Sequence, residues 1–225
     1  GGVQGVRYSE TKPEEELDQR ELELKGVPTY FEAEFMKYRT EGEYKLIDLS
    51  GDIHIWQEGK HMYGNLANYN HKTDDFLIQN DVRFITSDLN WLVDRTKKDQ
   101  FESEDMNESL GMKTDITCDR LQFNSDKKIL KMTGNVKVVQ EDKVIKADVL
   151  EFDDGNNKVV LSGMVEIIKE GEESLKCRRL EVDIENEEFY AYHTVETEFR
   201  LKSKKNESDS DLEERDEDKV ENVLE

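Results

Sequence analysis

Apolar and polar residues alternate along most of this chain, and the alternation slips at regular intervals. Within residues 134–152, Val136 and Val138 share one face of a predicted strand, and Ala147 continues that face after a polar turn. The next apolar position on that face is Leu150, one residue later than strict alternation requires. A slip of one residue is typical of a β-bulge or a corner in a sheet.

The same slipped pattern recurs, which predicts a repeat protein. Its first half is apolar-x-small-x-x-apolar-x-apolar, found at Phe31, Ala33, Met36, Tyr38; Met62, Gly64, Ala67, Tyr69; Ile116, Cys118, Leu121, Phe123; Ile145, Ala147, Leu150, Phe152; and Leu175, Cys177, Leu180, Val182. Its second half alternates around a turn residue, at Ile47, Leu49, Gly51, Ile53, Ile55; Phe76, Ile78, Asn80, Val82, Phe84; Leu130, Met132, Gly134, Val136, Val138; Val159, Leu161, Gly163, Val165, Ile167; and Phe189, Ala191, His193, Val195, Thr197. The small and turn residues lie 18 residues apart in the first unit (33 to 51) and 16 apart in the others (64 to 80, for example). This constancy predicts units of about 29–30 residues that stack in register.

Turn-forming segments separate the predicted strands. They include Gln57 to Lys60, His71 to Asp74, Ser125 to Lys127, Asp153 to Asn157, Gly171 to Glu173 and Glu185 to Glu187. Each unit therefore holds two hairpins, and successive strands run antiparallel. If every strand bends at its slip, the chain forms an all-β, antiparallel folded meander whose two facing sheets enclose the apolar positions.

The repeat does not cover the whole chain. Residues 1–28 are polar and contain both prolines, so we interpret them as a linker. The repeats then predict one β-domain over residues 29–201, and residues 202–225 read as an acidic, disordered tail. Residues 82–112 fit the pattern poorly and are expected to form a degenerate sixth unit, irregular over 106–112.

Composition and charge exclude some classes of function. The 225 residues carry a formal net charge of -22, which disfavours binding to nucleic acid or simple adsorption to an anionic membrane. Any anionic partner must be held by apolar contact or through bridging cations. Apolar residues make up only 35% of the chain, which predicts a thin core, and no apolar run is long enough to span a membrane.

The histidines and carboxylates, which could act in catalysis or bind a metal, form no catalytic or metal-binding pattern. His54 and His61 are expected on opposite strands of one hairpin as cross-strand neighbours, but no further ligand completes a tetrahedral metal set; His71 and His193 lie elsewhere. The carboxylates alternate with lysines on outward positions, as on a solvated face. We therefore predict no metal, no cofactor and no enzymatic activity.

The cysteines occupy equivalent positions in units separated by one intervening copy. Cys118 and Cys177 would therefore lie several strands apart, and because strands are spaced at about 4.8 Å this exceeds the reach of a disulfide. Both are expected to be free thiols that face the interior.

The repeated elements resemble the OstA-like lipopolysaccharide-transport bridge family, whose members include LptA and LptC. The resemblance covers residues 30–199 and rests on the strand starts Gly134 to Val138 and Gly163 to Ile167 and on the A-D-x-L-x-F element Ala147 to Phe152. The segment Ser87 to Trp91, followed by Phe101 to Ser103, looks more like LptC than LptA. The acidic tail, the length and the absence of an N-terminal anchor from this sequence leave open an LptC-like chain, an LptA-like chain or a hybrid.

The resemblance implies a twisted β-jellyroll, open along one edge, whose interior holds the acyl chains of lipopolysaccharide during passage across the periplasm. It implies tethering to the inner membrane through an anchor absent from this sequence, and edge pairing with similar bridge domains and an inner-membrane transporter complex. The residues expected to line the lipid slot are Phe31, Met36, Ile53, Ile55, Phe76, Ile78, Val82, Phe84, Trp91, Leu121, Phe123, Val136, Val138, Leu150, Phe152, Val165 and Ile167. Those expected at the partner edges are Tyr30, Phe35, Tyr38, Tyr192, Val195 and Phe199.

Two other readings of the same pattern stay open. In the first, the inward residues simply fill a closed, dry core, and the chain is a structural or adhesive β-repeat protein of the cell envelope. In the second, a β-solenoid acts on polysaccharide, but the sequence lacks the carboxylate cluster that this chemistry needs.

Overall fold

The computed structural model describes residues 2–7, 27–89, 104–169 and 173–199. Its elements are β1 (Val3–Arg7), β2 (Thr29–Ala33), β3 (Phe35–Glu41), β4 (Tyr44–Gln57), β5 (Lys60–Asn70), β6 (Asp75–Thr86), α3 (Glu104–Gly111), β7 (Thr114–Asn124), β8 (Ile129–Gln140), β9 (Lys143–Asp153), η3 (Asp154–Asn156), β10 (Lys158–Lys169), β11 (Glu173–Asp183), β12 (Glu188–Tyr192) and β13 (Glu196–Phe199).

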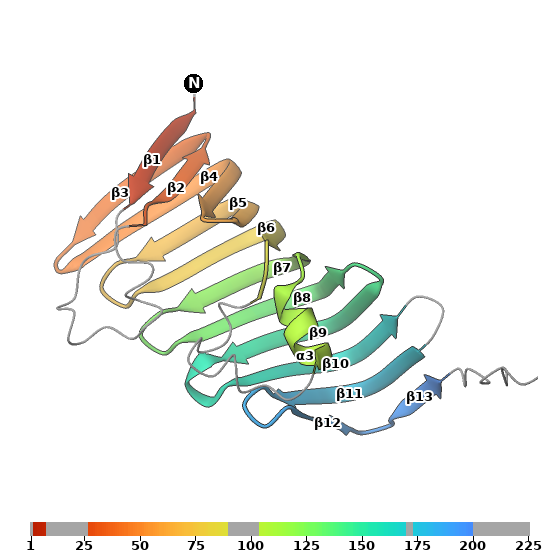
Figure 1. Ribbon diagram of the computed structural model, residues 1–225. Coiled ribbons are helices and arrows are strands. Elements are labelled where there is room, and N and C mark those ends of the chain that lie inside the picture. Colours follow the sequence, from red (N-terminus) through yellow and green to blue (C-terminus); the bar gives the residue numbers. More distant parts are fainter. Residues whose placement is uncertain (1, 8–26, 90–103, 170–172, 200–225) are drawn as a thin grey trace, which may run out of the picture.

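The strands form one 13-stranded sheet in which the paired strands run antiparallel (Figure 1). The main path runs β1, β2 and then β4 to β12 in sequence order, while β3 pairs with β4 and β13 with β11. Each hairpin therefore adds its strand beside the last one. This confirms the predicted antiparallel meander with its repeated units.

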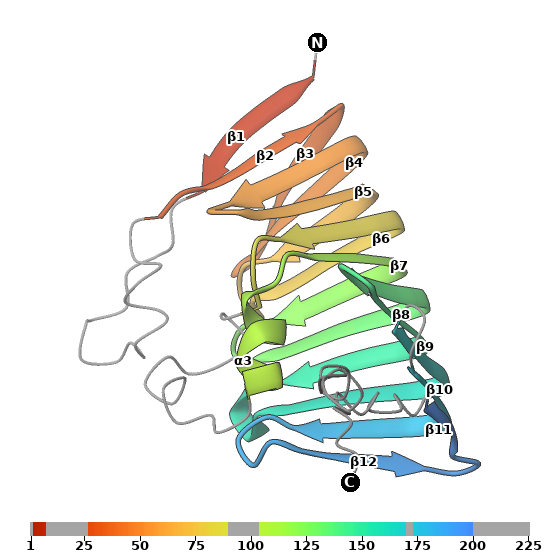
Figure 2. The ribbon, with the colours of Figure 1, turned by 45° about the vertical axis from the view of Figure 1, so that its right-hand side comes forward.

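Each slip predicted on β5, β7, β9 and β11 lies opposite a β-bulge, and the bulges themselves are in the middle of β4, β6, β8 and β10. At each bulge two residues face a single residue of the adjoining strand: Gly51 and Asp52 face Asn65, Asn80 and Asp81 face Asp119, Gly134 and Asn135 face Asp148, and Gly163 and Met164 face Arg178. An extra residue in one strand bends it and increases its twist. Because the bulges are aligned across the sheet, they form one corner along which the sheet folds (Figure 2).

Local chemistry stabilises the corner. Gly134 has φ +77 and Asn135 φ +49, the left-handed region that favours these residue types. The Asn135 side-chain amide donates to both carboxylate oxygens of Asp119 on β7, at 3.3 and 3.0 Å. A Cβ atom on Gly134 would lie 2.2 Å from Oδ2 of Asp119, so the carboxylate occupies the space that a side chain would need. At this bulge the corner thus places a glycine beside an acidic residue, whereas the equivalent bulge of β6 uses Asn80 at φ +67.

The apolar positions of both halves of the strands face one interior. Ile53, Ile78, Val82, Leu121, Met132, Val136 and Val165 are at most 2% exposed. The buried residues form a large cluster spanning β2 to β9 and a smaller one over β9 to β11. The inward alternation on both sides of each bulge, predicted from the slip, is therefore confirmed.

Two parts of the chain differ from expectation. Residues 3–7, within the expected linker, form β1, which pairs along β2; Gly5 lets the Phe31 ring approach its backbone closely. Within residues 106–112, expected to be irregular, α3 continues to Gly111. Most of the expected linker (8–26), residues 90–103 and the whole expected tail (202–225) lie outside the described residues.

Candidate functional site

Two rows of large apolar side chains cross the inner face, one in each half of the folded sheet. Strand register places the first row, near the hairpin ends, at Tyr38, Ile47, Tyr69, Phe76, Phe123, Leu130, Phe152, Val159, Val182 and Phe189. It places the second row at Phe31, Ile55, Met62, Phe84, Ile116, Val138, Ile145, Ile167 and Leu175. We call these the first and second rim rows.

Burial along the rim rows depends on position in the sheet. In the central strands Phe84 and Phe152 are only 6% and 4% exposed, whereas Phe189 at the C-terminal edge is 68% exposed. Side chains of the second row near the edges, such as Phe31 and Leu175, are half-buried. The second rim row is therefore buried over β6 to β8 and partly exposed toward both ends, whereas the first rim row is also exposed in the middle of the sheet, where Phe123 on β7 is 39% exposed.

The residues expected to line a slot do share the inner face. Buried are Ile53, Ile78, Val82, Phe84, Leu121, Val136, Val138, Phe152 and Val165, and half-buried are Phe31, Met36, Ile55, Phe76, Leu150 and Ile167. Phe123, in the first rim row, is 39% exposed. Trp91 lies outside the described residues. Lipid binding by this surface stays a prediction.

Three apolar side chains from outside the strands join or pack against the large core cluster, and the repeat pattern includes neither Leu110 nor Ile184 among them. Leu110 of α3 is 4% exposed and belongs to the large core cluster, against which Leu89 also packs. Ile184, in the turn after β11, is 4% exposed in the same cluster. Leu110 shows no strand periodicity, and Leu89 lies in the degenerate sixth unit; Ile184 continues the alternation of Leu180 and Val182, but the repeat pattern ends at Val182.

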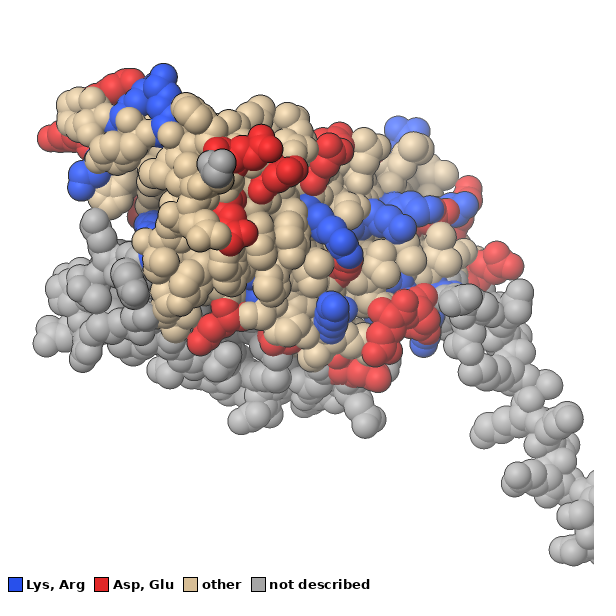
Figure 3. Space-filling view, turned by 90° about the horizontal axis from the view of Figure 1, so that it is seen from above, with Lys and Arg blue, Asp and Glu red and all other residues tan. Residues whose placement is uncertain are grey.

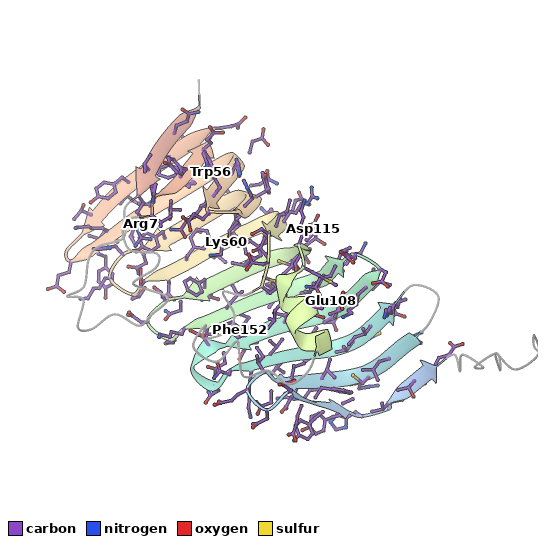
Figure 4. All side chains as sticks on the ribbon, viewed as in Figure 1. Arg7, Trp56, Lys60, Glu108, Asp115 and Phe152 are labelled. Atoms are coloured by element: carbon purple, nitrogen blue, oxygen red, sulfur yellow. The ribbon has the colours of Figure 1, made fainter. Side chains whose placement is uncertain are left out.

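The helix α3 lies beside the ends of the strands (Figures 1 and 2), where hydrogen bonds attach it to β8 and β9. Gln140, at the end of β8, donates to the Ser109 carbonyl at 3.0 Å and to Oγ1 of Thr114 at 2.8 Å. Lys143 Nζ donates to Ser109 Oγ at 3.2 Å, and the Leu89 N–H donates to the Leu110 carbonyl at 2.7 Å. Figure 4 shows the labelled Glu108 on α3 and Phe152 at the opposite end of the strands.

The edges of the sheet differ in part from those expected. The sequence places Tyr30 at an edge, but β1 pairs with β2 and leaves Tyr30 one strand inside it. Phe35 and Tyr38 lie on β3, which pairs with β4 at the side of the main path, and are 60% and 54% exposed. At the other end, Tyr192 is 39% exposed on β12, and Val195 is 48% exposed between β12 and β13. Phe199 pairs through its backbone with Glu173.

A stack of aromatic rings lies on the outer face of β2, β4 and β5. The His54 ring stacks on Trp56 and Tyr63 with centroids 4.4 and 4.5 Å apart, and Trp56 stacks on Tyr30 at 5.4 Å. His54 Nε2 lies 3.1 Å from His61 Nδ1, which confirms the predicted cross-strand neighbours. Burial, and then the nearby His61, lower the pKa of His54. Within the described ranges no group of three potential ligands is placed to hold a metal ion.

The titratable groups with shifted pKa values favour their ordinary charge states. A hydrogen bond from Arg83 lowers the pKa of Asp115, and one from Lys146 lowers that of Glu166. These carboxylates are thus held ionised, the opposite of what a general acid needs. Burial raises the pKa of the Cys118 thiol to about 11, and both cysteines are free and buried, as predicted.

Charged side chains of both signs intersperse on the face shown in Figure 3. Examples on the outer face are Lys131 with Glu151 and Lys146 with Glu166, each pair 2.8 Å apart across neighbouring strands. Such exposed pairs contribute little to stability. Among the described residues no helix is long and apolar enough to cross a membrane.

The folded sheet and its apolar interior define an all-β antiparallel jellyroll. No family model matches the chain, and no curated protein matches it. Among solved structures the chain is similar to LptH from Pseudomonas aeruginosa, described as the LptA-homologous periplasmic component of the lipopolysaccharide transport device. The identity is 9%, the match covers 78% of this chain and 96% of LptH, and the TM-score is 0.31. A likeness at this level supports no conclusion about function.

Proposed function

We propose that this chain is a non-enzymatic, periplasmic lipopolysaccharide-binding component of an export bridge. The observation that carries the proposal is the partly exposed apolar surface at both ends of the rim rows, including Phe31 and Ile55 near one end and Ile167 and Leu175 near the other. A protein that only needs a core gains stability by burying such side chains fully. The ligand class comes from the resemblance of the repeats to the OstA-like family.

Transfer of a lipid between such surfaces needs no catalytic group. Each acyl segment that leaves water gains about 25 cal/mol per Å² of buried apolar area, and neighbouring strands offer similar side chains. The lipid can therefore move along a rim row in steps of similar free energy. The net charge of -22 makes apolar contact, rather than attraction to phosphate, the main source of affinity.

The edges of the sheet support assembly end to end with other domains of this kind. The β1 and β3 edges carry exposed Val6 and Phe35, and the β12 edge carries Phe189 and Tyr190. Exposed strand edges pair readily with other chains, and pairing here would continue the interior from one domain into the next. Partners are other OstA-like domains and an inner-membrane transporter complex, and an N-terminal anchor would tether the chain to that membrane.

Lipid extraction tests the proposal. Purified protein is incubated with lipopolysaccharide, separated from micelles by gel filtration, and analysed for bound lipid by mass spectrometry. We expect lipid to co-elute with the wild-type protein and with Gln122→Asp, an outer-face change, but much less with Phe123→Asp, its inner-face neighbour. Absence of lipid from the wild-type protein would reject the proposal.

A structural β-repeat protein with a closed core is the second candidate. The sealed middle of the interior favours it, since Leu110, Ile184 and Phe152 are each 4% exposed. It predicts that no lipid binds under any of these conditions.

A further inference from the structure

The helix α3 sits where a ligand of the interior would sit. Leu110 is 4% exposed and shares the large core cluster with Phe84, Ile116 and Val138 of the second rim row. It comes from neither half of the folded sheet, but from the segment that joins β6 to β7. An apolar side chain thus enters the interior from the side, as an acyl chain would.

Besides the packing of Leu110, polar groups at the strand ends attach α3. Their contacts include the hydrogen bonds from Gln140 to the Ser109 carbonyl and from Lys143 to the Ser109 hydroxyl. Thr114, which is fully buried, accepts the second Gln140 hydrogen bond and itself donates to the Met112 carbonyl at 3.2 Å. The sheet pairing of β6, β7 and β8 does not involve α3, so the strands keep their ladder bonds if α3 leaves.

Departure of α3 exposes a specific surface. Phe84, Ile116 and Val138 are adjacent across β6, β7 and β8 in register, and each is 6% exposed in the structure. These side chains form a continuous apolar strip next to half-buried Met62 on one side and Ile145 on the other. Because exposing such a strip to water is unfavourable, it stays covered until another apolar group replaces the helix.

We propose that this strip, Phe84, Ile116 and Val138, is an acyl-chain binding site, and that Leu110 of α3 is its built-in occupant, displaced when lipid binds. The inference rests on the proposed function and deepens it by naming the binding site. This site lies between the two partly open ends of the interior, which it would join into one continuous path. In the lipid-free chain α3 separates these ends. An acyl chain that replaces Leu110 joins them.

The test uses two readouts on the full chain in a Cys118→Ala, Cys177→Ala background, since the equivalent repeat positions 33 and 147 already carry alanine. A spin label at Glu108→Cys, an exposed site on α3, reports the position of the helix. A soluble fluorescent fatty acid below its critical micelle concentration reports binding. We expect the fatty acid to increase the mobility of this label but not that of a label at Lys131→Cys on the outer face of β8.

Releasing α3 should strengthen binding. Leu110→Asp places a charge in the core cluster and should increase the apparent affinity for the fatty acid about tenfold, because affinity scales with the fraction of the binding-competent state. The control Glu108→Ala should leave affinity unchanged. Equal affinity of wild type and Leu110→Asp, with an unchanged label, would overturn the displacement of α3 while the proposed function stands. Absence of binding to both would overturn both.

A second variant covers the case in which Leu110→Asp does not fold. Ser109→Cys with Lys143→Cys, joined by a short bismaleimide, pins α3 to β9, because the two native side chains are in hydrogen-bond contact. Loss of binding on cross-linking supports the proposal. Unchanged binding by the pinned protein contradicts it.

Discussion

Phe152 and Phe189 both belong to the first rim row, yet one is 4% and the other 68% exposed. Both face the side of the sheet that forms the interior. Phe152 has neighbouring strands on both sides and Ile184 in its cluster, whereas Phe189 lies on an edge strand. The same local pattern therefore gives a buried core residue at Phe152 and an exposed apolar residue at Phe189.

The largest expected effect comes from truncating these two rings. Phe152→Ala should lower the free energy of unfolding by about 3–5 kcal/mol, since it leaves a cavity in a packed cluster. Phe189→Ala should change it by less than about 0.5 kcal/mol, as at other exposed sites. Urea denaturation measures both. Similar losses for the two variants would show that the edge is covered in solution.

The corner should be the next most sensitive place. Gly134→Ala puts a Cβ at φ +77, at a cost of about 1–2 kcal/mol, and also pushes the Asp119 carboxylate away from Asn135. Gly42→Ala is the matched control, because Gly42 has φ +64 in a hairpin turn, where an added Cβ would meet nothing within 4 Å. Urea denaturation should show the greater loss at Gly134. Equal losses would mean that Asp119 does not stabilise the corner.

The cysteines allow the interior to be probed without changing its shape. Burial raises the pKa of both thiols, that of Cys118 to about 11, so both should react slowly with iodoacetamide in the native state. Cys118 lies in the large central cluster and Cys177 in the smaller one toward the C-terminal edge, so Cys177 should react first. Mass spectrometry of timed samples gives the order. Faster reaction of Cys118 would show that solvent reaches the interior at the middle of the sheet rather than at its C-terminal edge.

The smallest effect is expected from pH at the N-terminal end. The pKa of His54 is lowered in the folded chain by burial and by His61, while Glu32 opposes the shift. The unfolded chain therefore binds more protons, and the contribution of His54 to stability is complete above about pH 6.5 and falls as pH decreases below it. His61→Asn should reduce this dependence in thermal unfolding measured between pH 5 and 8. An unchanged profile would assign the dependence to other groups.

The strands, their antiparallel order and the corner could be predicted from the sequence, because a period of two and a repeated slip are properties of neighbouring residues. The close approach of the Asp119 carboxylate to Gly134 could not be predicted, since the two residues lie on different strands. The edges of the sheet were harder to predict than the corner. The edge strand β1 is only five residues long, and its Gly5 shows no alternation because it lies close to the Phe31 ring. Leu110 carries no strand periodicity, and Ile184 lies beyond the repeat pattern although it continues the alternation of Leu180 and Val182, so only the three-dimensional structure reveals that both join the core cluster.

Site-specific photo-crosslinking tests most directly whether the interior binds lipid. A benzophenone amino acid is placed at Phe123, in the first rim row, or at the adjacent Gln122, on the outer face, and the protein is irradiated with lipopolysaccharide. We predict a lipid adduct at position 123 and none at 122. Equal cross-linking at both positions, or at neither, would contradict a lipid-binding interior.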